Sequence, residues 1–322
     1  MIWKILPATL AIMMTVATVS ASHLDPPCAA VIRNSRALVA RERITDAEAL
    51  LSRFLDGLQG DEACRASVLI DMANALQQLG KSEEAQQAAE ESIRLIERAE
   101  GASAPLLRQP LLVLAQLAFA KYNFHRSASL LARADQLANA PHSYLATSHG
   151  LKGSILLSEG NLDGAETEFR ASLEERAQDG EDKSSLAVPE IVHLAMVDLR
   201  RARPSDALIE TERASRIIEH SPYSPELSIN VLLLSALSRA GLHQNKEAEK
   251  DFERARKKIV DLPSSLQASL GRSVYEQYES FLRTTGRKSE AKQLARQQTE
   301  LFGPDHSSLT VSADSLLENR RK

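Results

Sequence analysis

The chain has 322 residues, of which 43% are apolar and 25% charged, so it can bury a large core and lacks the low hydrophobicity of a disordered protein. Aromatic residues are few (7 Phe, 5 Tyr and 1 Trp), while Ala, Leu, Glu, Arg and Gln, which favour helices over strands, are abundant. The formal charge of -4 and the scarcity of aromatic side chains argue against nucleic-acid binding. The composition therefore indicates a folded, all-α protein.

The first residues have the pattern of a secretory signal peptide. Lys4 supplies a positive charge, residues 5–19 form an uncharged apolar run, and Val19-Ser20-Ala21 offers small residues to a signal peptidase. We expect cleavage after Ala21, which would remove residues 1–21 and leave a periplasmic or secreted protein. The alternative is an uncleaved membrane anchor, but a span needs about 20 apolar residues, more than this run provides.

Alanines recur at a nearly constant spacing along the rest of the chain, each opening a predicted helix after a short turn. Successive differences between them are 38, 43, 37, 42, 41 and 43 residues. Such a period is typical of a repeated helical hairpin, because a single hairpin cannot bury its apolar face alone. The recurring residues are Ala47, Ala85, Ala128, Ala165, Ala207, Ala248 and Ala291.

The clearest hairpin has helices predicted over residues 149–158 and 163–177, separated by a turn at Gly160. In several hairpin turns a Gly or Pro precedes an Asn or Ser that can cap the second helix. We expect Asn161, Ser82 and Ser289 to be such caps. One turn, Leu242-His243-Gln244-Asn245, is expected to be longer than the others.

Cys28 and Cys64 are the only cysteines of the chain. Export would place them where disulfides persist, and an even number in an exported chain favours a bridge. Each lies near the start of the first helix of a hairpin, in consecutive repeats, so stacking would bring the two helix ends together. In a cytosolic chain two separate buried thiols would be expected instead.

This pattern resembles the tetratricopeptide repeat family. The resemblance covers nearly the whole chain after the signal peptide and implies a right-handed solenoid of about seven helix-turn-helix repeats over residues 22–302. The spacing, with the Gly-Pro-Asp-His segment that begins at Gly303, is similar to the longer repeats of kinesin-light-chain type. The residues that carry the resemblance are Gly153, Gly160, Ala165, Phe169 and Ser172, and more weakly Ala73, Gly80, Ala85, Gly286 and Ala291.

Residues 303–322 are expected to form a C-terminal capping helix and tail. Leu309, Val311, Leu316 and Leu317 recur at helical spacing. The ends of a solenoid need a cap with a polar outer face.

In stacked hairpins the first helices line a concave groove, and the resemblance implies that a partner protein or peptide binds there. The predicted face has an apolar middle and a basic edge, which suits a segment with apolar anchors and some negative charge. Alternatively, the apolar residues pack against neighbouring repeats. The predicted partner-binding residues are Asp71, Asn74, Gln78, Val113, Leu117, Lys121, His193, Met196, Arg200, Val231 and Arg239.

The sequence suggests no catalytic residues, metal ligands or cofactor. The eight histidines are scattered, without carboxylates or cysteines at ligand spacing. The carboxylate-clamp members of the family hold a peptide C-terminus, but only Asn74 matches their pattern. We therefore expect an exported interaction scaffold that is not an enzyme and keeps no membrane span after cleavage. Two alternatives stay open: an architectural subunit of an envelope complex that uses its outer faces, and a small-molecule binder or enzyme.

Overall fold

The computed structural model describes residues 25–219, 225–260, 262 and 264–303. In these residues the structure is helical, with fourteen α-helices, two short 3-10 helices and no strand, as the composition predicts. The predicted signal peptide and the predicted capping helix lie outside the described residues. The described chain divides into two compact units between Ile155 and Leu156.

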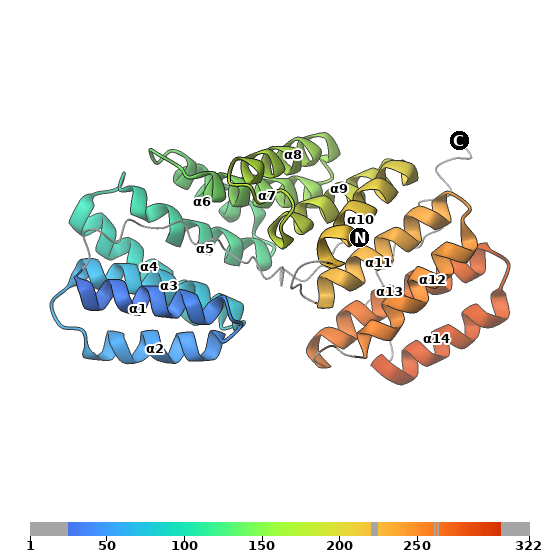
Figure 1. Ribbon diagram of the computed structural model, residues 1–322, viewed down its shortest axis with the longest axis horizontal. Helices are drawn as coiled ribbons and strands as arrows, with labels where there is room; N and C mark the ends of the chain where they lie inside the picture. Colours follow the sequence, from blue (N-terminus) through green and yellow to red (C-terminus); the bar gives the residue numbers. More distant parts are fainter. Residues whose placement is uncertain (1–24, 220–224, 261, 263, 304–322) are drawn as a thin grey trace. The chain divides into compact units, whose positions relative to one another are not determined.

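The first unit contains three complete hairpins, in each of which consecutive helices pack as a pair (Figure 1). A 3-10 helix, η3 (Pro105–Leu107), leads into the third hairpin, and the following helix α7 begins in this unit. The helices are α1 (Pro26–Val39), α2 (Ile44–Gly57), α3 (Glu62–Gln78), α4 (Ser82–Glu100), α5 (Arg108–Ala120), α6 (Phe124–Asp135) and α7 (His142–Glu159).

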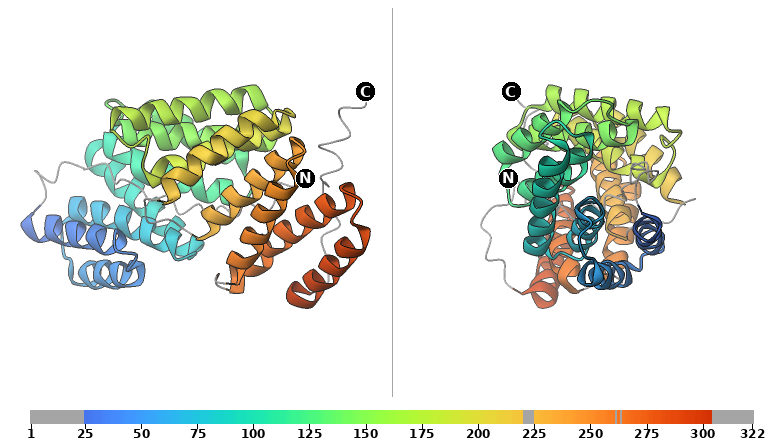
Figure 2. Two further views of the ribbon diagram at one scale, coloured as in Figure 1. Left: turned by 45° about the vertical axis from the view of Figure 1, so that its right-hand side comes forward. Right: turned by 90° about the vertical axis from the view of Figure 1, so that its left-hand side faces the viewer.

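The second unit continues the pattern from the end of α7, with a further 3-10 helix, η4 (Ser185–Ala187). Figure 2 shows its last hairpins from two further directions, each helix lying beside its partner. The helices are α8 (Leu162–Gln178), α9 (Val188–Arg200), α10 (Pro204–Glu219), α11 (Pro225–Gly241), α12 (Asn245–Ile259), α13 (Ser264–Thr284) and α14 (Lys288–Phe302).

A small buried residue occupies the fourth position of every second helix. Six of the seven predicted alanines hold this place, but the third repeat differs from the prediction. There Ser127 is fully buried and donates its hydroxyl to the carbonyl of Ala115 at 2.8 Å, while Ala128 is exposed. Serine fits because its small hydroxyl finds a buried acceptor, so nothing unpaired is left in the core. The seven residues are Ala47, Ala85, Ser127, Ala165, Ala207, Ala248 and Ala291.

All seven hairpin turns share one backbone conformation. Two positions before each second helix, the backbone has positive φ, and the next amide donates to the carbonyl five residues earlier at 2.8–2.9 Å. This is the Schellman arrangement, which ends a helix and satisfies its last carbonyls. Three of these positions are glycine and four are not. They are Glu42, Gly80, Tyr122, Gly160, Ala202, His243 and Gly286.

Several predicted boundaries move in the structure. The turn at His243 is no longer than most of the others, because α11 continues to Gly241. The helix predicted to start at residue 149 begins at His142, directly after Pro141. Asn161 caps α8 as expected by accepting from the Gly164 amide at 3.0 Å.

Two predicted caps are instead part of their helices. Ser82 is the first residue of α4 and Ser289 the second residue of α14, after residues whose side chains make no capping hydrogen bond. In these two repeats the second helix therefore begins without a capping side chain, directly after the turn that ends the first helix.

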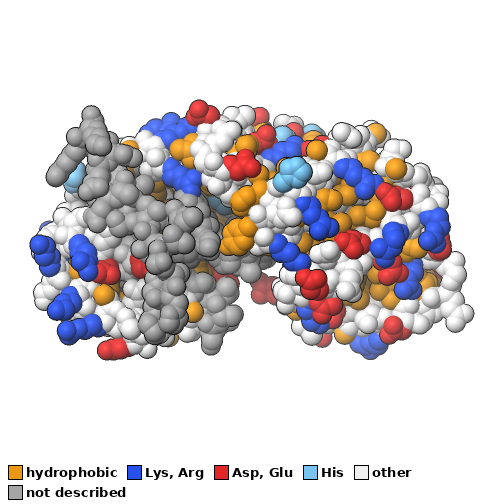
Figure 3. All heavy atoms as spheres, turned by 180° about the vertical axis from the view of Figure 1, so that it is seen from behind, with side chains coloured by type: hydrophobic (Ala, Val, Ile, Leu, Met, Phe, Trp, Pro, Cys, Tyr) orange, Lys and Arg blue, Asp and Glu red, His pale blue; other side chains and the backbone are white. Residues whose placement is uncertain are grey.

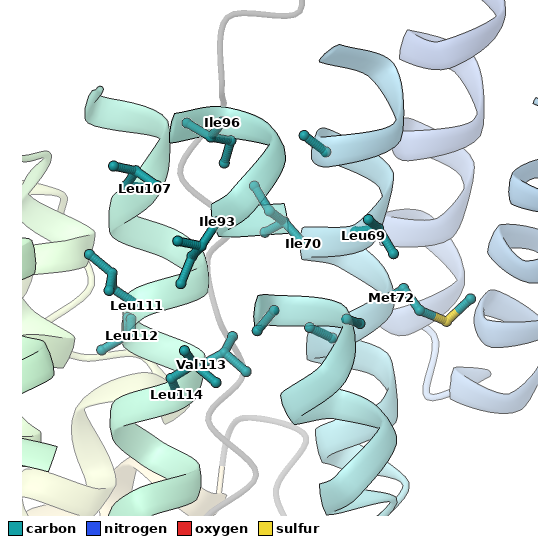
Figure 4. Close-up of a cluster of buried hydrophobic side chains, with 14 of the residues drawn as sticks. Leu69, Ile70, Met72, Ile93, Ile96, Leu107, Leu111, Leu112, Val113 and Leu114 are labelled. Carbon is teal, nitrogen blue, oxygen red and sulfur yellow. The ribbon is translucent and has the colours of Figure 1, made fainter. Parts of the chain in front are cut away.

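First and second helices differ in how they are buried. In α3 and α5 continuous runs, 66–76 and 108–118, are buried, so neither helix shows the one-sided burial of a surface helix. In α4 the buried residues recur at helical spacing and the rest face solvent. Figure 4 shows the cluster where side chains of both kinds of helix meet, including Ile70, Ile93 and Leu111.

A disulfide joins Cys28 of α1 to Cys64 of α3, with Cα atoms 5.9 Å apart. Both sulfurs belong to buried residues in the core of the first unit. The bridge therefore lies between the first helices of consecutive repeats, where the sequence predicts it. Among the described helices, none is both long and apolar enough to cross a membrane.

Candidate functional site

The site residues predicted on α3 begin with a buried carboxylate. Asp71 accepts hydrogen bonds from Arg36 of α1, at 3.1 Å from Nε and 3.2 Å from the terminal nitrogen. The Ser35 hydroxyl lies 3.5 Å from the same carboxylate. Burial raises the pKa of Asp71, and the Arg36 guanidinium opposes this rise. Asp71 is thus already paired within the fold and links α3 to α1.

Asn74, one turn further along α3, is different. It is 8% exposed, and both its side-chain oxygen and nitrogen are buried without a hydrogen-bond partner. A buried primary amide can donate two hydrogen bonds and accept two, and leaving them unmade costs about 1–3 kcal/mol. Asn74 therefore has unused hydrogen-bonding capacity.

The same position of the next repeat also holds an amide. Gln116 of α5 lies eleven residues before Ser127, as Asn74 lies eleven before Ala85. Its oxygen accepts from Gln77 Nε2 of α3 at 3.1 Å, while its nitrogen is buried without a partner. Asn74, Gln77 and Gln116 form what we call the α3–α5 amide row. The sequence did not predict Gln116, because alignment on Ala128 shifts the third repeat by one residue, and Gln77 lies beside the residues predicted on α3 and not among them.

The remaining predicted residues of this unit have structural contacts or are exposed. Val113 and Leu117 of α5 are buried in the core, with Val113 at the cluster of Figure 4. Gln78 is exposed at the end of α3. Lys121, after α5, pairs with Glu83 at 2.7 Å and thereby lowers the pKa of that glutamate. Val113 and Leu117, predicted as part of the apolar middle of the groove, thus belong to the core. They pack against neighbouring repeats, which is the alternative expected for these apolar residues.

In the second unit, the residues predicted on α9 are also largely engaged. Met196 is buried, and the half-buried His193 ring stacks on Phe169 of α8 with centroids 4.8 Å apart. Burial lowers the pKa of His193 to about 4, so the ring is neutral at pH 7. Arg200 donates to the Leu157 carbonyl at 2.8 Å, and burial lowers its pKa to about 10.

The two predicted residues of α11 also take part in the fold. Val231 is buried beside the α9 core. Arg239 pairs with the buried carboxylate of Asp251, and its guanidinium also lies 3.5 Å from the Glu212 carboxylate. The Asp251 carboxylate accepts a further hydrogen bond from the Ser235 hydroxyl at 2.8 Å. The basic edge predicted at Lys121, Arg200 and Arg239 is therefore occupied by partners from the chain itself.

No group of three or more His, Cys, Asp or Glu residues that could hold a metal ion occurs among the described residues. On the face shown in Figure 3, side chains of both charges are interspersed with apolar ones. Charge density alone therefore marks no site on that face, and whether each charge is paired becomes the more informative property.

One segment of the chain matches a family model. Residues 66–98, which cover most of α3 and α4, match the model described as Tetratricopeptide repeat. The match falls on the repeat that carries Asn74, Gln77 and the turn at Gly80. No curated protein sequence matches the chain.

Solved structures with similar folds include two Rap proteins. The apo form of RapI is 14% identical, with a TM-score of 0.58 over 85% of this chain and 97% of that one. A Rap protein complexed with competence and sporulation factor is 11% identical, with a TM-score of 0.65 over 92% and 79%. BtubC from P. vanneervenii is 16% identical, with a TM-score of 0.53 over 73% and 89%. At these identities the similarity shows the fold alone.

Proposed function

Because the chain carries a tetratricopeptide repeat at residues 66–98 within a helical-repeat fold, we propose that it binds a partner protein or peptide through the faces of its first helices. The observation that carries this proposal is the α3–α5 amide row. Asn74 and Gln116 are buried at equivalent positions of consecutive repeats, and together they leave an amide oxygen and two amide nitrogens without partners.

The chemistry of the row indicates what part of a partner it would bind. A primary amide can donate to a main-chain carbonyl and accept from a main-chain N–H of the same extended segment. The three members are uncharged, so they would read the peptide main chain and not a charged side chain. One of the similar solved structures, the second Rap protein, is described as a complex with competence and sporulation factor, which agrees with this class of function.

The other predicted groove residues differ in how far they are exposed. Gln78 is exposed at the end of α3 and could border a bound segment. Val113, Leu117, Met196 and Val231 are buried, so substitutions there would test the fold and not the binding alone. We propose that the α9 and α11 faces form a second part of the partner-binding surface, within their own unit.

The test uses the full chain and a library of displayed peptides. Selected peptides are measured against wild type and the Asn74→Leu variant. Leucine has a similar shape but no hydrogen-bonding groups, so we expect binding to fall by at least about tenfold. Stability should rise by about 1 kcal/mol, because the unpaired amide no longer has to be buried.

A matched control is Asn34→Leu on the exposed side of α1, which should change neither peptide binding nor core stability. Methylating single main-chain nitrogens of a bound peptide should abolish binding at the positions that the row contacts. If Asn74→Leu binds peptides as wild type does, or loses stability, the amide row is structural and the proposal is wrong.

We also propose that the protein acts outside the cytosol. The signal-like pattern of residues 1–21 and the Cys28–Cys64 disulfide support export, since bridges of this kind persist in oxidising compartments. The mass of the chain isolated from its source would test this, because cleavage after Ala21 leaves Ser22 as the first residue.

A further inference from the structure

Lysines gather on two neighbouring helices near the end of the described chain. Of the ten lysines in the described residues, six lie on α12 and α14. These helices pack side by side, since Arg287 pairs with Glu249 at 2.8 Å and Arg256 donates to Gln297 at 3.3 Å (Figure 1). The lysines therefore belong to one surface region of the second unit.

On α12 the cations lie on the side opposite the core. The core side consists of Ala248, Phe252, Ala255 and Ile259, all buried. At three- and four-residue spacing on the opposite side, every cation is exposed. On α14 three more exposed cations follow at four-residue spacing. We call the set the α12–α14 cationic face: Lys246, Lys250, Arg254, Lys257, Lys288, Lys292 and Arg296.

Most of these cations have no ion-pair partner among the described residues, unlike several lysines elsewhere in the chain. Elsewhere, Lys81, Lys121 and Lys152 each pair with a carboxylate at 2.7 Å. On the cationic face, only Arg254 makes an ion pair in the described part of the chain, at 3.6 Å from Asp251. A charge without an internal partner does not hold the fold together, so it remains available to an anion outside the chain.

The nearby carboxylates are mostly engaged by other arginines. Arg287 pairs with Glu249 and Glu290, and Arg239 pairs with Asp251. Glu253 pairs with Arg256 at 2.8 Å. On these two helices only Glu247 and Glu300 remain as exposed carboxylates without an ion pair, so the seven cations of the face far outnumber the unpaired carboxylates.

Exposed aliphatic residues lie at the same ends of both helices. Val260, just after α12, is 75% exposed, and Leu301, in the last turn of α14, is 62% exposed. Because α12 and α14 are second helices of consecutive repeats, they run in the same direction, and these residues lie at corresponding ends. Cationic rows bordered by exposed aliphatic side chains are typical of surfaces that bind a lipid interface.

We propose that the α12–α14 cationic face binds the surface of an anionic phospholipid membrane. The cations are spread over two adjacent helices, so together they can contact many headgroups at once. Five of the seven are lysines, whose compact charge suits diffuse phosphate charge, whereas paired recognition of carboxylates favours arginine. This inference concerns outward faces of the second helices and does not depend on the amide row.

The test is sedimentation of the full chain with vesicles. Vesicles of phosphatidylglycerol and phosphatidylcholine in equal parts should bind the protein, whereas phosphatidylcholine alone should not. Binding should weaken as sodium chloride is raised, because salt screens exposed charges. The Lys250→Gln/Lys257→Gln variant should partition roughly tenfold or more weakly, since each lysine near an anionic surface contributes to binding.

The matched control is Arg33→Gln/Arg94→Gln, which removes the same charge from exposed cations of α1 and α4. It should bind vesicles as wild type does. Equal losses in both variants would mean that net charge alone drives binding, which overturns the proposal. Binding that inorganic phosphate displaces at constant ionic strength would indicate a discrete anion site, and stronger binding to polyglutamate than to vesicles an acidic protein partner; either result also overturns it.

Discussion

Four hairpin turns place a residue with a side chain at positive φ, a conformation that costs L-residues about 1–2 kcal/mol relative to glycine. Ala202 is such a residue, with φ of 54°, at the position that Gly80, Gly160 and Gly286 occupy elsewhere. The three glycines show that the turn itself accepts Gly. The surrounding helices therefore impose this conformation on Ala202, and relieving it should stabilise the hairpin.

Replacing Ala202 with glycine should raise the free energy of unfolding by about 0.5–1 kcal/mol, since relief of strain outweighs the extra freedom of the unfolded chain. Urea unfolding followed by circular dichroism measures this as a higher midpoint at unchanged slope. The reciprocal variant Gly160→Ala should lower the midpoint by a similar amount. A lower midpoint for Ala202→Gly would show that the turn is not strained.

His193 gives the fold a dependence on pH. Its pKa is lowered to about 4 in the folded protein, whereas the same side chain in the unfolded chain has a pKa near 6.5. Between these two pH values the unfolded chain therefore binds a proton that the folded chain does not bind. Stability that is fully present above pH 6.5 should therefore decline as the pH falls toward 4, by up to about 3 kcal/mol.

The His193→Phe variant keeps a ring against Phe169 and should lack this decline. Unfolding midpoints measured between pH 7 and pH 4 would show it, with His125→Phe on the exposed side of α6 as the control. If the two variants have the same pH dependence, His193 does not account for the decline.

At the scale of the helices, the disulfide holds α1 and α2 onto the rest of the first unit. It closes a loop with a sequence separation of 36, which in the chain-entropy model stabilises this end by roughly 3–4 kcal/mol. The ion pair of Arg36 with Asp71 also joins α1 to α3, the two helices that the disulfide links. Repeats are stabilised mainly by their neighbours, so losing the bridge should affect the first repeat most.

The Cys28→Ala/Cys64→Ala variant should accordingly exchange the amide hydrogens of α1 and α2 much faster than wild type. Amides of α13 and α14 serve as the control within the molecule and should keep their protection. Hydrogen exchange followed by mass spectrometry resolves the two regions. Uniformly faster exchange in all helices would contradict a local role for the bridge.

The sequence predicted the helical hairpins better than their faces. The alanine period revealed the repeats because a small residue is needed wherever two helices of a pair cross closely. It failed at Ala128, because Ser127 can fill the same space with its hydroxyl bonded to the Ala115 carbonyl. The turn at His243 also could not be predicted, since packing imposes there a conformation that glycine usually marks.

The predicted groove residues show a different limit. On second helices the apolar side faces the core, so the sequence distinguishes the two sides. In the first helices α3 and α5 buried residues occur on every side, so the pattern of apolar residues carries no information about which side would face a partner. Val113 and Leu117 were predicted as contacts for this reason, by the same tracing of one helix face that selected Asn74.

In a repeat fold, stability depends mainly on the interfaces between neighbouring repeats. The outward surfaces of the first and second helices can therefore bind different partners. The amide row lies on first helices and the cationic face on second helices, so substitutions in one should leave the other intact. The vesicle and peptide experiments can therefore be made on the same variants, each serving as a control for the other.

The covalent link between Cys28 and Cys64 also changes how the chain would carry mechanical tension. A force applied at the N-terminal end of the described chain passes through the two sulfurs directly into α3, so the 35 residues between them bear no load. Pulling the oxidised protein apart would release roughly 120 Å less contour length than pulling the reduced one. A load applied to the chain before Cys28 therefore leaves the first repeat unstretched for as long as this bond holds.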